Sequence, residues 1–179
     1  MRVTAIADAA IEVVAAEGMR GLTHRAVDRA AGLPAGSTSY YARTRAALLE
    51  LTIGRILELD DAEITVGTDR TAPALAKFLH VSLTKGRSRL IARYEFALEA
   101  TRRPELRAIY DSAGRRFRDS CTRLLTDLGS PEPERHTRML IAWCDGLLFD
   151  SVAGAGAARK PKLAELERGT HEFLRALLP

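Results

Sequence analysis

Residues 17–49 read EGMRGLTHRAVDRAAGLPAGSTSYYARTRAALL, and the order of caps and glycines in this stretch decides the fold. Thr23 is a suitable N-cap for a short helix over His24–Ala31, because its hydroxyl can accept a hydrogen bond from the first helical turn. Gly32 then stands where a helix commonly ends in a left-handed residue. Pro34 fixes the backbone torsion that opens a second short helix. Two short helices joined by a tight glycine turn indicate a helix-turn-helix.

Apolar residues at helical spacing continue the pattern on both sides of this stretch. Residues 4–16 predict a first helix, which Gly18 ends. Its apolar stripe consists of Ile6, Ala10, Val13 and Val14. Thr44 can cap a long fourth helix that reaches about Glu63. We therefore predict an N-terminal domain over residues 1–46 that contains three helices.

Helical periodicity also dominates the rest of the chain, and no segment alternates with period two as a strand would. Breaks are expected at 67–70, a linker, and at 129–131. A loop rich in glycine and alanine at 153–158 precedes the last helix, which is expected over 161–178. The predicted fold class is all-α, with a second helical domain over residues 47–179.

One of these helices is unusual, because the segment Met139–Val152 is apolar on every side apart from Asp145, Asp150 and Ser151. A helix that is apolar all round must be buried all round. It packs either between its own core and a second subunit or as the central helix of a monomeric bundle, and we favour the dimer. The last helix could complete such an interface. The expected interface residues are Leu140, Leu147, Leu148, Phe173 and Leu174.

The composition fits a compact protein with a hydrophobic core, since 46% of the 179 residues are hydrophobic and 28% are charged. These values exclude charge-driven disorder and a membrane protein. Acidic residues interrupt the N-terminal apolar stretch, and the longest apolar run, 139–149, is too short for a bilayer. Cys121 and Cys144 form neither a disulfide framework nor a metal-ligand pair. We expect a cytoplasmic protein with reduced, core-packed thiols.

Positive charge is concentrated in the helix-turn-helix. The net charge of +4 permits a polyanionic partner without requiring one, but residues 20–45 contain five arginines and a single acid, Asp28. Hydroxyl groups add short hydrogen-bond donors, and Ala35-Gly36-Ser37 is small enough for close approach to a major groove. Such groups bind phosphate and fix the register of a protein on DNA. A solvated, mildly basic hairpin is the alternative, but the tight turn and its hydroxyl groups favour double-stranded DNA as a partner.

Patterns that would indicate catalysis or metal binding were not found in the sequence. The histidines show no zinc-ligand spacing, and neither a nucleophile elbow nor a phosphate loop occurs. His24 and Asp28 are interpreted as an ordinary surface pair. Glu95 and Glu99 are interpreted as a solvated acidic patch, with Glu99 paired to Arg103 at i,i+4. We therefore predict that the chain is not an enzyme and uses no cofactor and no metal.

Aromatic residues mixed with polar groups in the second domain are candidates for a small-molecule pocket between helices. An aromatic residue at helical spacing more often belongs to the core, so ordinary packing is the alternative for each of them. The candidate ligand-binding residues are Phe78, Tyr94, Phe96, Tyr110, Phe117, Trp143 and Phe149.

The motif over residues 4–50 resembles the DNA-binding region of TetR-family transcriptional regulators. The resemblance rests on Glu17–Val27, Ala30–Ser37, Tyr40-Tyr41 and Thr44–Leu49. The later helices resemble the family's ligand-binding and dimerisation domain in number and length. The chain departs from the family pattern at Thr38-Ser39, where Leu-Tyr is usual, and at Ala42, where Phe is usual.

The resemblance implies a DNA-binding role for nine residues. Thr23 would grip phosphate at the start of the second helix, and Arg25 would reach a base. Tyr40 and Tyr41 would meet the DNA backbone, and Arg45 would hold phosphate at the start of the fourth helix. The full set is Thr23, Arg25, Ala35, Gly36, Ser37, Ser39, Tyr40, Tyr41 and Arg45.

The sequence thus predicts a ligand-responsive transcriptional regulator. The expected form is a repressor that binds a palindromic operator as a homodimer and is released by a small-molecule inducer, whose binding would pivot the fourth helix. The alternative is a helical small-molecule sensor or carrier without operator binding. The sequence does not identify the inducer, the operator, the regulated genes or the base contacts, nor whether the protein represses or activates.

Overall fold

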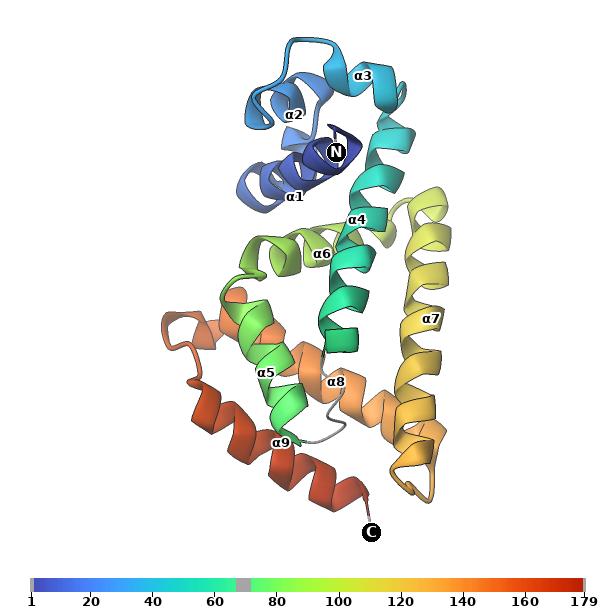
Figure 1. The fold of residues 1–179 in the computed structure, drawn as a ribbon, viewed down its shortest axis with the longest axis vertical. Coiled ribbons are helices and arrows are strands. Elements are labelled where there is room, and N and C mark those ends of the chain that lie inside the picture. The colour runs from blue at the N-terminus through green and yellow to red at the C-terminus, as the bar shows by residue number, and fades with distance from the viewer. Residues whose placement is uncertain (1, 67–71, 179) are drawn as a thin grey trace. The chain divides into compact units, whose positions relative to one another are not determined.

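The computed structural model describes residues 2–66 and 72–178, and every regular element within them is helical. The predicted all-α class is therefore confirmed, whereas the predicted linker at 67–70 lies outside the described residues. Figure 1 labels the elements. They are α1 (Arg2–Gly21), α2 (His24–Ala30), α3 (Ser37–Tyr41), α4 (Arg45–Val66), α5 (Ala72–Leu83), α6 (Arg87–Ala100), α7 (Pro104–Asp127), α8 (Pro133–Val152), the short 3₁₀ helix η1 (Ala155–Ala158) and α9 (Leu163–Leu177).

The chain divides into two compact units. Unit 1 contains Met1–Ala62 and Ser88–Asp111, and unit 2 contains Glu63–Arg87 and Ser112–Pro179. Nearly all of α6 and the start of α7 therefore belong with the N-terminal helices, whereas α5, α8 and α9 belong to unit 2. The predicted division after residue 46 was made by expected function and does not coincide with the boundaries of these compact units. It stays a prediction.

Unit 1 has one hydrophobic core, which receives side chains from α1, α2, α4 and α6. The predicted stripe of α1 is buried, with Ile6 and Val14 fully covered. Val27 of α2 and Phe96 of α6 are also 0% exposed. Burial of each such large side chain contributes about 1.5–3 kcal/mol. Figure 1 shows α1, α2 and α3 gathered around one end of α4. The shared core therefore packs the helix-turn-helix against the long helix α4.

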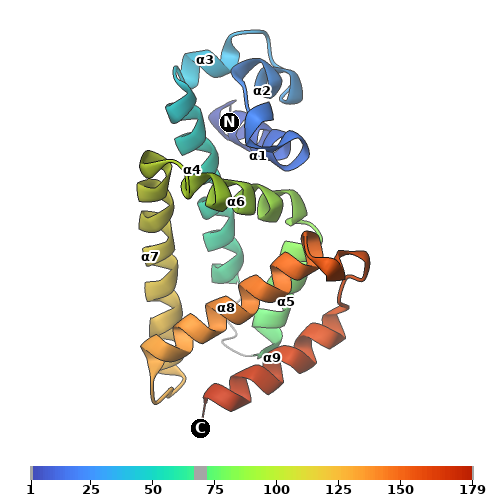
Figure 2. The same ribbon diagram turned by 180° about the vertical axis from the view of Figure 1, so that it is seen from behind.

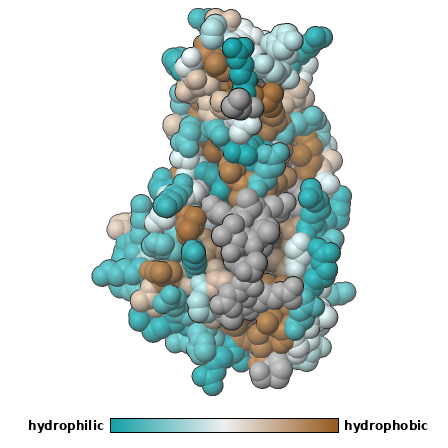
Figure 3. Space-filling model, viewed as in Figure 1, coloured by the Kyte–Doolittle hydropathy of each residue, from teal (hydrophilic) through white to brown (hydrophobic). Residues whose placement is uncertain are grey.

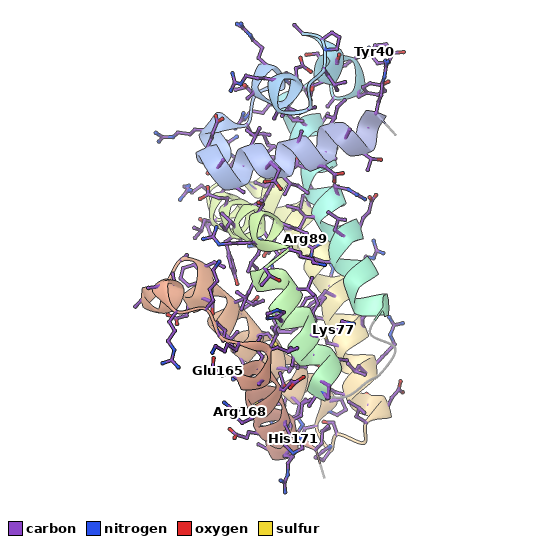
Figure 4. The ribbon with its side chains drawn as sticks, turned by 60° about the vertical axis from the view of Figure 1, so that its left-hand side comes forward. Tyr40, Lys77, Arg89, Glu165, Arg168 and His171 are labelled. Carbon is purple, nitrogen blue, oxygen red and sulfur yellow. The ribbon has the colours of Figure 1, made fainter. Side chains whose placement is uncertain are left out.

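Charged side chains add links between α4 and its neighbours in unit 1. Asp8, which lies off the apolar stripe of α1, pairs with Nε of Arg55 at 2.7 Å. Arg89 of α6 pairs through Nε with Asp60 at 2.8 Å, and Nη1 of Arg93 lies 3.9 Å from the same carboxylate. Figure 4 shows Arg89 extending from α6 beside α4. The side chains of Arg89 and Asp60 are only 10% and 16% exposed, so loss of either partner would leave a poorly solvated charge.

Unit 2 is built on the pairing of α5 with α9. These two helices make the most extensive contact, and α5 also packs on α8. Figures 1 and 2 both show α9 alongside α5. Leu79 of α5 and Leu166 of α9 are buried between the helices of this unit. The hydroxyl of Thr170 donates to the carbonyl of Ala72 at 3.0 Å, which ties α9 to the first residue of α5.

The predicted local signals act as expected at several helix ends. Thr44 Oγ1 accepts a hydrogen bond from the N–H of Ala47 at 3.1 Å and caps α4. Gly18 has φ 68° and ψ −176°, a region that is essentially restricted to glycine, and it interrupts α1 where the first helix was predicted to end. The expected loop at 153–158 differs, because residues 155–158 form η1. The carboxylate of Asp150 accepts the N–H of Gly156 at 3.1 Å and draws this segment back toward α8.

The surface mixes polar and apolar side chains. On the face drawn in Figure 3, mostly hydrophilic or intermediate side chains cover the end that carries α2 and α3. Among the large hydrophobic residues, Tyr40, Leu98 and Phe149 are the most exposed, at 76%, 56% and 45%. None of the helices in the described part of the chain combines the length and the apolar character that crossing a membrane requires.

Candidate nucleic-acid interface

The turn between α2 and α3 is shaped by two glycines in the left-handed region. Gly32 has φ 64° and Gly36, the N-cap of α3, has φ 90°, and a Cβ would be strained at both. The N–H of Ser37 donates to the carbonyl of Pro34 at 3.1 Å and closes a turn before the helix. The predicted start of this helix at Pro34 is therefore three residues too early. Ala35 and Gly36 precede α3 instead of lying on it.

Asp28 fixes the position of α3 against α2. Its side chain is buried, with 3% of the residue exposed. Its Oδ2 accepts the N–H of Gly36 at 2.8 Å, and its Oδ1 accepts the N–H of Thr38 at 2.7 Å. The first amides of a helix have no partner within the helix, so this carboxylate caps α3 from the neighbouring helix. The interpretation of Asp28 as half of a surface pair with His24 is wrong for this reason.

The surroundings of Asp28 favour its charged form. Burial alone would raise the pKa of the carboxyl group, but the hydrogen bonds from Thr38 and Gly36, together with nearby His24, outweigh burial and hold the pKa below its ordinary value. The carboxylate is therefore ionised at neutral pH. Hydrogen bonds from amides to a charged acceptor are stronger than those to a neutral one.

Two cationic or polar side chains tie the ends of the helix-turn-helix to its neighbours. Nε2 of His24 lies 2.6 Å from the carbonyl of Ala42, which joins the start of α2 to the residue after α3. Arg45 donates from Nη1 to the carbonyl of Leu22 at 2.5 Å and from Nη2 to the carbonyl of Met19 at 2.6 Å. Arg45 thus commits two of its five N–H donors to the last turn of α1 and to the residue that follows it. The remaining donors are what it could offer to a phosphate.

The other residues predicted to bind DNA lie on the surface around this turn. The exposed ones are Thr23, Arg25, Ala35, Gly36, Ser39, Tyr40 and Tyr41, and Ser37 is half-buried. The rings of Tyr40 and Tyr41 meet edge to face, with 5.0 Å between their centroids. Figure 4 shows Tyr40 pointing away from the ribbon. The structure therefore brings the predicted set together on one part of unit 1.

Cationic side chains are available on the same part of unit 1. Within the described ranges, the side chains of Arg20, Arg25 and Arg43 are exposed and make no hydrogen bond or ion pair. Arg29 differs, because its guanidinium lies 3.8 Å from the carboxylate of Glu17. Both side chains of that pair are well exposed, so the pairing is worth little and can be exchanged for another anion.

Two of the positions that depart from the family pattern face the interior. Thr38 is 0% exposed and Ala42 is 1% exposed. The residues that usually occupy them are bulky and apolar, whereas here α3 is held from beneath by the hydrogen bond between Asp28 and the Thr38 amide. Ser39, the third departure, is exposed and belongs to the outer side of α3.

The aromatic residues predicted to bind a ligand do not fall in one unit. Unit 1 holds Tyr94, Phe96 and Tyr110, and unit 2 holds Phe78, Phe117, Trp143 and Phe149. Phe96 is fully buried in the core of unit 1. Trp143 stacks on Phe173, with 4.8 Å between ring centroids and 14° between the ring planes. The guanidinium of Arg107 lies 4.9 Å from the ring centroid of Tyr110, a cation–π contact.

The residues predicted for a dimer interface are only partly at the surface. Leu140 and Leu148 are 5% and 1% exposed and are covered by their own chain. Leu147, Phe173 and Leu174 are half-buried. The apolar side chains that α8 leaves exposed are instead Met139 at 39% and Phe149 at 45%. Met139 and Phe149 therefore give α8 exposed apolar side chains, and these lie on the face opposite to the one that packs inside unit 2.

The described residues contain no group of three or more His, Cys, Asp or Glu side chains placed to hold a metal. Cys121 and Cys144 are free thiols and are partly covered. Burial raises the pKa of the Cys121 thiol to about 11, with a small opposing effect from Arg118, so this cysteine is a poor nucleophile at neutral pH.

Two acidic residues have structural roles that the sequence interpretation missed. Asp28 offered a signal, because it is the lone acid in a basic segment. Glu95 offered no local signal, since its Oε2 accepts the N–H of Met19, 76 positions earlier, at 3.4 Å. The predicted pairing of Glu99 with Arg103 is confirmed at 2.6 Å.

Comparison with known proteins identifies the family. A family model for the tetracyclin repressor-like C-terminal domain matches residues 66–179, more than half of the chain. No curated protein matches the sequence. A TetR-family member from Streptomyces coelicolor A3 is 26% identical, covers 100% of this chain and 99% of its own, and superposes with a TM-score of 0.76.

Two further solved structures are similar over nearly the whole chain. The multidrug binding protein EbrR, complexed with ethidium, is 26% identical, with coverage of 100% of this chain and 99% of that chain and a TM-score of 0.72. A transcriptional regulator from Rhodococcus sp. Rha1 shares the fold, with 23% identity, coverage of 99% and 96%, and a TM-score of 0.79. The chain belongs to the tetracycline repressor-like (TetR) family of transcriptional regulators.

Proposed function

We propose that this protein is a ligand-responsive repressor that binds a palindromic operator as a homodimer. The observation that carries the proposal is the exposed surface around α3, which Asp28 fixes from below and which Arg25, Tyr40 and Tyr41 line from outside. Arg20 and Arg43 supply further cationic groups on the same unit. Membership of a family of transcriptional regulators supports DNA as the polyanion that this surface binds.

In this proposal α3 enters the major groove and its surroundings hold the backbone. Ser39 lies on the exposed side of the short helix, and Ala35, Gly36 and Ser37 at its start are small enough to let the turn come close to the DNA. Hydroxyl groups of Thr23, Tyr40 and Tyr41 suit phosphate oxygens, which fix register and carry little sequence information. Two copies of α3 related by a two-fold axis would meet successive major grooves.

A small-molecule effector is proposed for the C-terminal domain. The similar structure of EbrR is that of a multidrug binding protein with a bound dye, which supports a ligand-responsive role for this chain. An inducer must bind the DNA-incompetent state more tightly than the DNA-competent one. A coupling free energy of about 1–3 kcal/mol changes DNA affinity by roughly 5–150-fold. The protein would act in the cytoplasm, where its operator is.

Salt dependence tests the DNA contact. Labelled duplex from the region upstream of the protein's own gene is titrated, with fluorescence anisotropy as the readout, over a series of salt concentrations. We expect a steep loss of affinity with salt, and we expect Arg45→Ala, which removes a proposed phosphate contact, to reduce the slope of log K against log salt by about one. The matched control is Arg159→Ala, because this arginine of unit 2 is 87% exposed and should leave the slope unchanged.

The second candidate is a small-molecule sensor or carrier without operator binding. It is favoured by Arg45, whose guanidinium donates to two backbone carbonyls and is only partly available for phosphate. Equal affinity of the wild-type protein for its own upstream DNA and for random duplex at moderate salt would establish this candidate and reject the repressor.

A further inference from the structure

Arg29 on α2 faces an acidic side chain from α1. Arg25 and Arg29 are four positions apart on α2, so their side chains leave the same face of that helix, and both residues are exposed. Within the described ranges the side chain of Arg25 makes no hydrogen bond or ion pair. Nη2 of Arg29, in contrast, lies 3.8 Å from Oε1 of Glu17. One of two neighbouring guanidinium groups is therefore partly neutralised within the protein itself.

The end of α1 leaves room for the Glu17 side chain. A Cβ at residue 21 would lie 2.8 Å from Oε2 of Glu17, nearer than such an atom can approach, and nearer still to the Cβ of Glu17. The carboxylate therefore uses the space that Gly21 leaves open. α1 and α2 pack against each other, and Figures 1 and 2 both show α2 next to α1. This packing brings the carboxylate within reach of Arg29.

The pair between Glu17 and Arg29 is weak enough for DNA to break. The two side chains are 50% and 74% exposed, so water solvates both charges and the ion pair contributes little to stability. Duplex DNA offers the same negative charge at high density, about one charge per 1.7 Å of helix axis. Arg29 can therefore exchange the carboxylate for a phosphate close to the base contact proposed for Arg25.

We propose that Arg29 is a further phosphate-binding residue and that Glu17 competes with DNA for it. The carboxylate lowers the affinity of the surface around α3 for every duplex, because a phosphate must first displace it. Contacts to phosphate carry no sequence information directly, so this competition acts on operator and random DNA alike. The inference rests on the part of the proposed function that assigns duplex DNA to this surface. It adds one binding residue and one internal competitor to that contact.

Four variants separate this competition from general repulsion between an acid and DNA. Glu17→Gln keeps the shape of the side chain against Gly21 and removes its charge. Arg29→Ala removes the proposed phosphate contact, and a double variant combines the two changes. The matched control is Glu12→Gln, which changes the net charge by the same amount. Glu12 is also an exposed acid of α1, and its side chain makes no ion pair or hydrogen bond within the described residues.

The experiment measures the affinity of full-length wild type and each variant for the upstream duplex and for random duplex of equal length. Fluorescence anisotropy is the readout, after thermal melting has established that each protein is folded. The ionic strength is about 0.15 M, where exposed charges more than about 8 Å apart are largely screened. A salt series at each duplex supplies the slope of log K against log salt.

The expected changes follow from the weakness of the pair. Glu17→Gln should bind both duplexes about two- to five-fold more tightly than wild type, and its salt slope should be steeper by up to about one. Arg29→Ala should bind less tightly than Glu17→Gln, and the double variant should bind like Arg29→Ala. Glu12→Gln should match wild type in affinity and in slope.

The outcomes are distinct. A gain in Glu17→Gln that disappears in the Arg29→Ala background supports the inference. A gain that persists without Arg29, or that Glu12→Gln reproduces, overturns it, because direct repulsion of DNA would then be the cause. Wild-type affinity of Glu17→Gln also overturns it and leaves the repressor function intact. Equal affinity of the wild type for the two duplexes rejects the repressor function alone, since the gain is measured on both, whereas no binding to either duplex rejects both.

Discussion

At the scale of single residues, the DNA-facing surface depends on a carboxylate that never reaches the surface. Asp28 joins two amides at the start of α3 to the middle of α2. Removing one partner from such a buried arrangement leaves the other groups unsatisfied, and this costs more than the bonds themselves contribute on average. The stability of the helix-turn-helix and its fit to DNA should therefore respond together to a change at this position.

Asp28→Asn tests this dependence. The amide oxygen can still accept one N–H, but the amide nitrogen then faces the second N–H, so we expect the free energy of unfolding to fall by about 1–3 kcal/mol. Asp8→Asn is the control, since the side chain of Asp8 is 48% exposed in its pair with Arg55 and its loss should cost less than about 1 kcal/mol. Urea unfolding at neutral pH measures both values. Equal small losses in the two variants would show that the capping role is unimportant.

The same variant gives a prediction about pH. Because the pKa of Asp28 is lowered in the folded protein, the ionised carboxylate stabilises the fold fully above its unfolded pKa, near 3.8, and this contribution is lost as the pH falls through the folded value. The difference in unfolding free energy between wild type and Asp28→Asn should therefore be constant above about pH 5 and shrink in more acidic solution. Unfolding curves from pH 7 to pH 3 measure it, and a difference independent of pH would contradict the cause assigned to the shift.

Signals from single residues in the sequence were sufficient to predict helix caps and helix ends, because those interactions are local. Thr23 caps α2, accepting the N–H of Ala26 at 3.1 Å, and Gly32 ends that helix with φ 64°, both as predicted. The role of Arg45 was not predictable in the same way, since its carbonyl partners lie 23 and 26 positions away. Local rules describe which residue ends a helix, and they carry no information about which distant backbone group a long side chain meets.

At the scale of elements, α3 is too short to be stable alone. A helix of five residues forms few of its own hydrogen bonds, and the cost of nucleating it is not recovered without outside contacts. The turn from Pro34 to Ser37 and the cap from Asp28 supply those contacts. This also explains why the helix starts later than proline placement predicted, because Gly36 adopts a left-handed conformation to present its N–H to the carboxylate.

The segment after α8 gives a prediction at the element scale. A Cβ on Gly154 would lie 2.7 Å from the Cα of Asp150, whereas a Cβ on Gly156 would meet only the carboxylate of Asp150. We expect Gly154→Ala to destabilise the protein by about 1–3 kcal/mol, because backbone must move. Gly156→Ala should cost about 1 kcal/mol, through loss of its hydrogen bond to Asp150.

The control for these two variants is Gly114→Ala on α7, where a Cβ would have no heavy atom within 4 Å. Alanine has the higher helix propensity, so this change should stabilise the protein by up to about 1 kcal/mol. Thermal unfolding ranks the three proteins. If Gly154→Ala were as stable as Gly114→Ala, the close approach of this loop to α8 would be rejected.

At the scale of the whole molecule, the division into units was not accessible from the sequence. Proline and glycine residues mark where helices begin and end, and they predicted the break before α8. They do not show that Ser88–Asp111 returns to the N-terminal helices. The assignment of this segment to unit 1 depends on which apolar helix faces pack together, as Phe96 does with the core around Val14. Because many helices carry similar apolar stripes, the sequence allows many pairings of helix faces.

The proposed homodimer yields the last prediction. Leu148 is 1% exposed, so a charge there would disturb the fold of unit 2 and would not report on assembly. Phe149 is 45% exposed and Met139 is 39% exposed on the outer face of α8. In an interface with two-fold symmetry each substitution occurs twice. Loss of a central aromatic contact costs about 2 kcal/mol or more. We therefore expect Phe149→Glu to be a folded monomer at concentrations where the wild type is a dimer.

The control is Leu98→Glu on α6, because Leu98 is 56% exposed and lies in unit 1. This variant should stay dimeric. Sedimentation velocity measures all three proteins, and a dimeric Phe149→Glu would place the interface elsewhere.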